Sequence, residues 1–285
     1  MERLQAAIEK ARAQRNEGGR TEGGRPAPAP RTNGAAALVT DTYADTVSLD
    51  ANWQSFRQID TTVPAFRDKK IAAFAGGAEA AAFDMLRTRV IQQARSNNWR
   101  RIAVVSPHSS CGKTTTVTNL AFSLGRNSDM RTLAIDFDLR RATLARMLNQ
   151  KPAHTMADVI EGRVPFADHG LRYGNSVAFG LNAGPVQNSS ELLQSNRTAA
   201  MLDEIDATYQ PDIVLFDMPP LMATDDSLAF LKNVDCALLI VAAEETPMSQ
   251  IDVAERQIAE LTQVMGVVLN KCRLMGSAYG YEYNY

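Results

Sequence analysis

Apolar and polar positions form alternating blocks along most of this chain, and the blocks predict alternating strands and helices. Continuous apolar runs predict strands over residues 101–106, 132–136, 177–183, 212–217, 236–243 and 264–270. Helical periodicity predicts helices over residues 78–97, 112–127, 140–149, 190–208, 225–232 and 248–262. Continuous apolar strands are typical of a sheet that helices cover on both faces. The pattern therefore predicts an α/β fold with a doubly wound, mostly parallel sheet.

The N-terminal part of the chain has a different pattern. Leu4 and Ile8 lie on one face of a predicted amphipathic helix over residues 1–16. Residues 17–76 open with paired glycines and alternating proline and alanine, which predict a flexible linker, followed by an extended surface segment anchored by residues such as Trp53. The predicted organisation is a helix over 1–16, this linker and segment over 17–76, a main domain over 77–272 and a tail over 273–285.

Composition and charge exclude several classes of protein. The chain is 45% hydrophobic and 22% charged, which is typical of a globular domain. Its 30 Lys and Arg against 32 Asp and Glu give a net charge of −2, so we expect no nucleic-acid partner bound through one basic surface. No apolar run approaches the roughly 18 residues of a membrane span, and no signal-peptide core follows Met1. The sequence therefore predicts a cytoplasmic protein, and its 3 widely spaced cysteines fit a reducing compartment.

A candidate phosphate-binding loop joins the predicted strand 101–106 to the next helix. Gly112, Lys113 and Thr114 match the end of the motif G-x-x-x-x-G-K-[ST], whereas Pro107 replaces its first glycine. Between a strand and a helix, backbone N–H groups and the positive helix end converge where phosphates bind. Lys113 would reach the β- and γ-phosphates and Thr114 would ligate Mg²⁺. The predicted nucleotide-binding residues of the loop are Ser110, Cys111, Gly112, Lys113, Thr114 and Thr115.

Carboxylates follow two other predicted strands. Asp136 ends the predicted strand 132–136 and Asp138 follows it closely, and Asp217 ends the predicted strand 212–217. Ligands of parallel sheets gather at the carboxyl ends of strands, and neighbouring carboxylates repel each other unless a cation is present. Each aspartate alone could be a turn or cap residue, and Gly-Lys alone could be a surface turn. Together they predict a site for ATP and Mg²⁺.

With these segments in place, residues 77–285 resemble the bacterial tyrosine kinases (BY-kinases) of capsule and exopolysaccharide biosynthesis, within the MinD/ParA-like P-loop ATPases. The matching segments are the phosphate loop at 106–115, an Asp-bearing segment at 133–141, another at 213–220, a turn similar to N-P-x-E-L-L at 188–193 and a last strand at 266–271. The resemblance implies a P-loop NTPase fold and an ATP-dependent protein-tyrosine autokinase. It implies catalytic roles for Lys113, Asp136, Asp138 and Asp217, with Asp136 as the candidate base, metal ligation by Thr114, Asp138 and Asp217, and an adenine contact by Asn270.

The end of the chain is rich in tyrosine. Tyr279, Tyr281, Tyr283 and Tyr285 lie within the last seven residues. The alternation is compatible with an edge strand, but the ATP site upstream favours a cluster of phosphoacceptors. An extended tail after Leu274 could reach ~36 Å, which predicts self-association through tail exchange between chains.

The resemblance is to the split type of this family, in which a separate membrane protein acts as chain-length regulator and activator. It therefore implies such a partner, and a cytoplasmic protein associated peripherally with the inner membrane through it. Residues 1–31 carry more Lys and Arg than Asp and Glu, which suits contact with that partner or with an anionic membrane surface, although a frayed terminus is the alternative. Ala81 and Asp84 replace the Glu and Arg with which the family assembles rings.

Two other functions compete with the kinase. One is a MinD/ParA-like ATPase switch, but such proteins usually have a second lysine in the loop, where this chain has His108. The other is a nucleotide-binding scaffold without transfer activity, because Pro107, Ser109 and Ser110 lower the glycine content of the loop. The tyrosine-rich tail favours the kinase.

Overall fold

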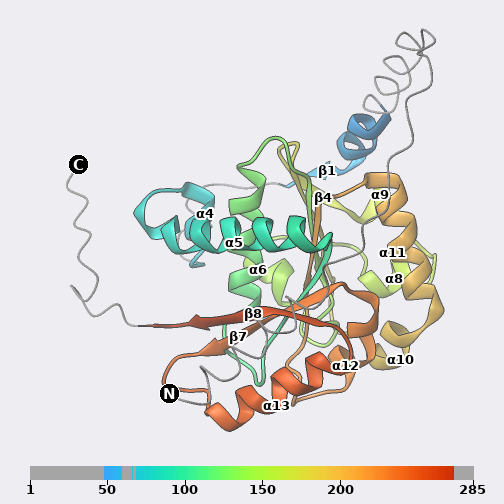
Figure 1. Ribbon diagram of the computed structural model, residues 1–285. Helices are drawn as coiled ribbons and strands as arrows, with labels where there is room; N and C mark the ends of the chain where they lie inside the picture. Colours follow the sequence, from blue (N-terminus) through green and yellow to red (C-terminus); the bar gives the residue numbers. More distant parts are fainter. Residues whose placement is uncertain (1–47, 60–65, 67–68, 273–285) are drawn as a thin grey trace, which may run out of the picture. The chain divides into compact units, whose positions relative to one another are not determined.

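The computed structural model describes residues 48–59, 66 and 69–272 (Figure 1). All of them belong to one compact unit. The predicted N-terminal helix over 1–16 and much of the linker lie outside the described residues. So do the predicted phosphoacceptors Tyr279, Tyr281, Tyr283 and Tyr285.

The described residues form an eight-stranded sheet. Its strands are β1 (Arg57–Gln58), β2 (Arg101–Val105), β3 (Thr132–Asp136), β4 (Leu171–Tyr173), β5 (Val177–Gly180), β6 (Ile213–Asp217), β7 (Cys236–Ala242) and β8 (Gln263–Asn270). Their spatial order is β1-β4-β5-β3-β6-β2-β7-β8. Neighbouring strands are parallel except for β4 and β5. This confirms the predicted mostly parallel sheet.

Helices connect the strands. Residues 48–55 are helical, and the later helices are α4 (Ala72–Ala75), α5 (Ala81–Asn97), α6 (Lys113–Gly125), α7 (Thr143–Met147), α8 (Met156–Ile160), α9 (Phe166–His169), α10 (Ser189–Gln194), α11 (Asn196–Tyr209), α12 (Asp226–Phe230) and α13 (Met248–Ala259). Short 3₁₀ turns are η1 (Ala78–Ala80) and η2 (Leu231–Asn233). None of the helices in the described ranges is long and apolar enough to cross a membrane.

The sheet has a hydrophobic core on each face. Along β2, Ile102 and Val104 belong to one buried cluster, whereas Ala103 and Val105 belong to the other. Helix α6 contributes to the first cluster and α11 to the second. Because successive strand residues point to opposite faces, this division shows that helices cover both faces, as the continuous apolar runs predict.

The first described segment packs into the core, in contrast to the predicted extended surface segment. Trp53 and Phe56 are buried, and the Trp53 indole N–H donates to the Tyr209 carbonyl at 2.7 Å. Phe56 stacks on the Tyr209 ring with centroids 4.5 Å apart. The isolated aromatic residues of this segment are therefore core residues, and their wide sequence spacing conceals that role.

Asn188 and Glu191, three positions apart, predict a capping box at the start of the helix 190–208, and the structure shows that this prediction is wrong. Asn188 precedes α10 with φ 55° and ψ 38°, and its side chain makes no cap hydrogen bond. A capping box instead opens α8, where Thr155 and Asp158 bond reciprocally. The predicted helix 190–208 is also interrupted, because Ser195 is extended and its hydroxyl begins α11 by accepting from the Thr198 N–H.

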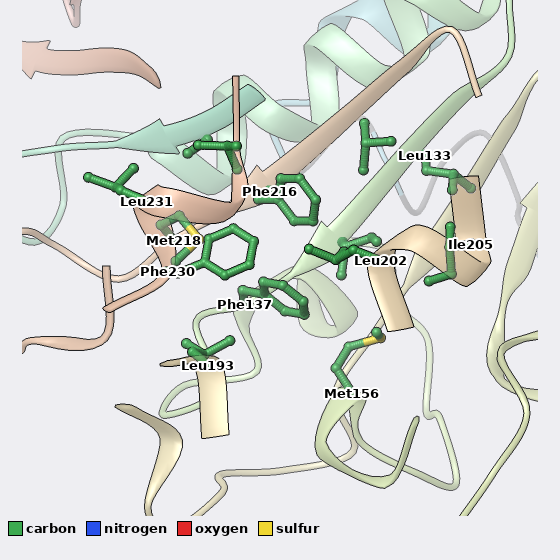
Figure 2. Packing of buried hydrophobic residues seen from close by; sticks show 14 of the residues in the cluster. Leu133, Phe137, Met156, Leu193, Leu202, Ile205, Phe216, Met218, Phe230 and Leu231 are labelled. Atoms are coloured by element: carbon green, nitrogen blue, oxygen red, sulfur yellow. The ribbon is translucent and has the colours of Figure 1, made fainter. Parts of the chain in front are cut away.

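An aromatic cluster fixes the two strand ends that carry the predicted carboxylates (Figure 2). Phe137 stacks on Phe216 with ring centroids 5.3 Å apart, and Phe230 packs edge-on against both at 4.8 and 4.9 Å. Phe137 lies between Asp136 and Asp138, and Phe216 directly precedes Asp217. The packing of these three rings therefore fixes the backbone at the ends of β3 and β6, which carry the carboxylates.

Candidate nucleotide-binding site

The phosphate loop follows β2 and opens α6 at Lys113. Gly112 has φ 97°, a region that favours glycine. A Cβ at this position would lie 2.1 Å from the Asn270 side-chain nitrogen. Glycine is thus required here both by backbone conformation and by close packing, and the N–H groups of the first turn of α6 face the loop.

Lys113 lies inside the loop and is only 7% exposed. Its ammonium donates to the Ser106 hydroxyl at 2.8 Å. Burial lowers the pKa of Lys113, while the charges of Asp217 and Asp138 oppose that shift. A buried cation placed between a loop of N–H groups and carboxylates is suited to anionic phosphates.

Asp217 ends β6 and is fully buried. Neither of its carboxylate oxygens has a hydrogen-bond partner of good geometry. Burial raises the pKa of Asp217 to about 7, and the nearby Thr114 hydroxyl and Lys113 charge lower it only in part. An unpartnered buried carboxylate is costly for the fold, so its presence indicates a ligand.

Asp136 lies at the end of β3, in register with Asp217 across the sheet. It accepts hydrogen bonds from the N–H groups of Asp138 at 3.2 Å and Leu144 at 3.3 Å. Burial, followed by the charges of Asp217 and Asp138, raises the pKa of Asp136 well above its ordinary value. Asp136 therefore shapes the loop after β3 through its two backbone hydrogen bonds.

Asp138 completes the group at 6% exposure, with its Oδ1 lacking a partner. Burial raises its pKa, and the charges of Lys113 and Arg141 lower it. The unpartnered oxygens of Asp138 and Asp217 and the hydroxyl of Thr114 fit Mg²⁺, which usually takes one or two carboxylates together with substrate phosphates. Among the described residues, no group of three or more His, Cys, Asp or Glu could hold a metal ion.

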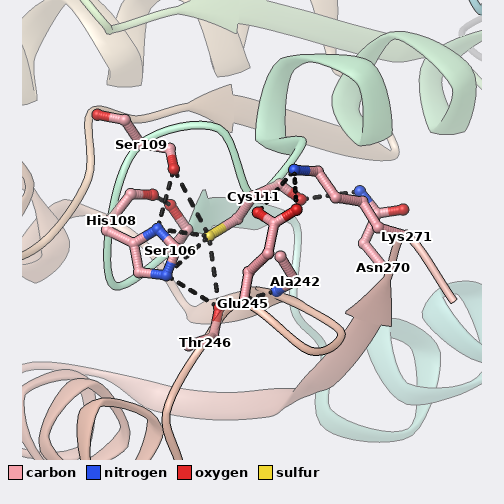
Figure 3. Close-up of polar contacts among 9 residues, drawn as sticks. All are labelled: Ser106, His108, Ser109, Cys111, Ala242, Glu245, Thr246, Asn270 and Lys271. Carbon is pink, nitrogen blue, oxygen red and sulfur yellow. Dashed lines mark hydrogen bonds and ion pairs between the residues drawn. The ribbon is translucent and has the colours of Figure 1, made fainter.

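The loop is tied to the ends of β7 and β8 by Cys111 and its neighbours (Figure 3). The buried Cys111 sulfur lies 3.4 Å from His108 Nδ1, and His108 Nε2 lies 3.0 Å from the Thr246 hydroxyl. That hydroxyl accepts from the Ala242 N–H at 3.0 Å. Asn270 donates to the Cys111 carbonyl at 2.8 Å. These contacts make Cys111 and His108 packing residues of the loop.

The remaining predicted loop residues differ in exposure. Thr114 and Thr115 are half-buried in the first turn of α6. Ser110 is exposed and has φ 66°, a conformation that favours glycine. Ser110 thus has the positive φ that a glycine would adopt at the same position of a glycine-rich loop. The structure brings Lys113, Thr114, Asp138, Asp217 and Asn270 to one edge of the sheet.

Several polar residues near the site were not among the predicted site residues. The Asn182 amide donates to the Asp136 carbonyl at 2.8 Å, and Asn182 is 1% exposed. Arg140 pairs with the buried Asp226 at 2.6 Å, and Asp226 also bonds the Ser189 hydroxyl. Asn182 and Thr246 each follow a buried strand, so their positions at strand ends are the signal that could have identified them.

The fold and the loop define a class of nucleotide-binding protein. A family model described as the CobQ/CobB/MinD/ParA nucleotide binding domain matches residues 102–277. The chain therefore belongs to this family.

Relatives and solved structures confirm the resemblance to bacterial tyrosine kinases. The chain is 28% identical over 192 residues to the tyrosine-protein kinase CpsD of Streptococcus pneumoniae, covering 66% of this chain and 83% of that protein. It is 31% identical over 211 residues to a protein of Klebsiella pneumoniae named as a tyrosine-protein kinase in the cps region, but spans only 27% of that protein's length. The kinase domain of the Escherichia coli tyrosine kinase ETK has the same fold, with a TM-score of 0.63 over 73% of this chain and 82% of that one at 23% identity.

Proposed function

We propose that this protein is a Mg²⁺- and ATP-dependent protein-tyrosine autokinase. The observation that carries the proposal is the convergence of a buried lysine and three aspartates at the carboxyl ends of β2, β3 and β6. Lys113 lies beside carboxylates whose oxygens are buried without partners. Such a set fits a transferable phosphate and a cation better than it fits a purely structural role.

The residues divide the work of phosphoryl transfer. Lys113 and the N–H groups of the loop hold the β- and γ-phosphates, and Asn270 contacts the adenine end. Thr114, Asp138 and Asp217 hold Mg²⁺, which when bound neutralises charge on the phosphate oxygens. Asp136 accepts the proton of the attacking hydroxyl, because its raised pKa makes it a stronger base.

The proposed acceptors are Tyr279, Tyr281, Tyr283 and Tyr285 in the tail. In the transfer, the tyrosine oxygen bonds to the γ-phosphorus, the bond from that phosphorus to the β–γ bridging oxygen breaks, and the hydroxyl proton passes to Asp136. ADP leaves with the electron pair. Tail exchange between associated chains would deliver one chain's tyrosines to another chain's site.

We assign the activity to the regulation of capsule or exopolysaccharide polymerisation or export at the cytoplasmic face of the inner membrane. The support is the relatives: one is named for the cps region, and CpsD matches over most of its length. A membrane-embedded chain-length regulator is the proposed activating partner. The excess of Lys and Arg in residues 1–31 suits contact with that partner.

The test is to follow the γ-phosphate of labelled ATP in the presence of Mg²⁺. An autokinase transfers label to tyrosine in the tail, whereas a MinD/ParA-like ATPase switch releases it as inorganic phosphate without labelling protein. A scaffold binds ATP and does neither. Release without protein labelling, with and without the cytoplasmic part of a chain-length regulator, would replace the kinase by the ATPase switch.

A further inference from the structure

Strand β8 (Gln263–Asn270) forms one edge of the sheet and pairs on its inner side with β7 (Figure 1). No other described strand lies along its outer side. Its eight residues include neither a charged residue nor a proline. Natural edge strands are usually protected by such residues, by β-bulges or by being short. The register with β7 shifts between Val264 and Gly266, and the pairing is regular from Gly266 to Asn270. The regular, uncharged part of the edge after this shift therefore favours the addition of another strand.

The side chains of Val267 and Leu269 lie on one face of the sheet, next to this edge. They are 47% and 59% exposed. Their register partners on β7 are Leu239 and Val241, which are buried in the core of that face. The apolar face of the sheet therefore continues to β8 and is left uncovered there among the described residues.

The peptide groups of the same two residues point away from β7. The Asn270 carbonyl accepts from the Ala243 N–H at 2.9 Å, so Asn270 faces β7. Because successive peptide groups of a strand alternate in direction, those of Leu269 and Val267 face outward. The Cys272 thiol agrees with this, since it donates to the outward Leu269 carbonyl at 3.4 Å.

The chain turns toward this outer side as it leaves the strand. Lys271 has φ 60°, which bends the backbone sharply. Lys271 is held there by its ion pair with Glu245 at 2.8 Å. Cys272 then lies against the outer carbonyl of Leu269. Cys272, at the end of the described residues, therefore lies beside the unpaired edge.

The rest of the chain has the length and the pattern to cover that edge. Thirteen residues follow Cys272 and could extend about 43 Å, whereas β8 spans roughly 26 Å. Gly276 and Ser277 favour a turn. The last eight residues, 278–285, then alternate alanine, glycine, glutamate and asparagine with tyrosine, so that in a strand every tyrosine shares one face.

We propose that the unphosphorylated tail folds back on its own chain and that residues 278–285 pair with the outer edge of β8 as an antiparallel strand. Its tyrosine face covers Val267 and Leu269, and its amides pair with their outward peptide groups. The docking of the tail does not depend on the proposed kinase activity. Only the release of the tail by phosphorylation rests on that proposed function. Phosphorylation would add about −1.5 to −2 charges to each tyrosine, and the phosphates would lie roughly 7 Å apart on one face of the strand. Because these charges repel one another and are better solvated by water than by the apolar side chains of Val267 and Leu269, phosphorylation releases the tail from the edge.

Residue-resolved hydrogen exchange tests the docking. The full chain, treated with a tyrosine phosphatase, is compared with a chain that ends at Cys272. We expect the Val267 and Leu269 amides to exchange about tenfold more slowly in the full chain. The Val268 and Asn270 amides face β7 and serve as internal controls with equal rates in both chains. Equal rates for Val267 and Leu269 in the two chains would overturn the proposal.

A second comparison separates docking within one chain from docking between chains. The full chain with Tyr281→Pro and Tyr283→Pro keeps its length but cannot form the strand, so we expect the protection of Val267 and Leu269 to be lost. Protection in the unaltered chain should not change with protein concentration. If the protection of the Val267 and Leu269 amides increases with protein concentration, the edge is instead covered by a second copy of the chain. That result would contradict folding back of the tail on its own chain. A Lys113→Met chain should be protected like the wild type, so failure of the kinase proposal leaves this test intact.

Discussion

Asp136 and Asp217 stand directly opposite each other as register partners on the neighbouring parallel strands β3 and β6. Both are fully buried, and burial raises the pKa of each. Two buried carboxylates at this spacing repel each other and weaken the fold when both are ionised. Packing alone does not explain two buried carboxylates in this position, whereas a bound cation beside the phosphates of a nucleotide would offset their repulsion.

Replacing either carboxylate of this pair by its amide should impair transfer without unfolding the protein. We expect Asp136→Asn and Asp217→Asn each to lower the initial rate of tyrosine phosphorylation by about 100-fold or more, because both act on charge that develops during transfer. Asp138→Asn should have a smaller effect if Asp138 holds Mg²⁺ through water. The exposed Asp252 of α13 provides the matched control as Asp252→Asn. A wild-type rate for Asp217→Asn at saturating Mg²⁺ and ATP would remove this residue from the site.

The Thr114 hydroxyl should govern the demand for Mg²⁺. Thr114→Val keeps the size of the side chain but removes the oxygen ligand, so we expect half-maximal activity at a Mg²⁺ concentration about tenfold higher or more. Thr114→Ser retains the hydroxyl and should restore nearly the wild-type concentration. A Mg²⁺ titration of phosphorylation rate measures both variants, and identical curves for Val and Thr would exclude Thr114 as a ligand.

Gly112 should be intolerant of even one methyl group. Gly112→Ala places a Cβ 2.1 Å from the Asn270 side-chain nitrogen at a backbone φ of 97°, so the Asn270 side chain must shift and the loop backbone is strained. We expect nucleotide affinity, measured by titration calorimetry, to fall by about 10-fold or more. Gly162→Ala is the control, because Gly162 also has a positive φ of 73° but its Cβ would meet nothing within 4 Å. Equal nucleotide affinity in the two variants would show that the packing at Gly112 is unimportant.

His169 should make the fold sensitive to acid. It is 5% exposed, its Nε2 has no partner, and burial lowers its pKa to about 4, with the nearby His154 charge adding to the shift and Asp158 opposing it. The unfolded chain therefore binds more protons than the folded one between pH 6.5 and 4, so stability is full above this range and falls as pH decreases.

The measurement is urea unfolding at pH 7 and pH 4.5. The wild type should lose on the order of 2 kcal/mol more stability than His169→Gln over this interval. His154→Gln, at an exposed position, should lose nearly as much as the wild type. Parallel losses in wild type and His169→Gln would contradict the assignment.

The sequence predicted the parts of the structure that local patterns encode. Continuous apolar runs gave the central strands, and residues after them, such as Lys113, Asp138 and Asp217, were predicted at one sheet edge where the structure places them. Strands β1 and β4 were missed because two or three residues carry no periodicity. Helices α8 and α9 were missed for the same reason.

Other features depend on partners that are distant in the sequence. The Trp53 indole donates to the carbonyl of Tyr209, 156 positions away, so its place in the core depends on a partner distant in the sequence. Asn182 reaches the backbone of Asp136 across 46 positions. Asn188 could be read as a helix cap from spacing alone, yet its left-handed backbone prevents the bond. Local pattern thus predicts elements and strand ends, whereas side-chain partners follow from the assembled fold.

The measurement that tests the central claim most directly is the intact mass and tyrosine phosphorylation of the full chain after incubation with Mg²⁺ and ATP. The wild type, first treated with phosphatase, should gain phosphates on Tyr279, Tyr281, Tyr283 or Tyr285. Lys113→Met should gain none, because the buried ammonium that meets the phosphates is lost, whereas Lys232→Met on the exposed surface should behave like the wild type. Phosphotyrosine in the tail of Lys113→Met protein incubated alone, or its absence from the wild type together with a membrane activator, would contradict the assignment of a tyrosine kinase to this site.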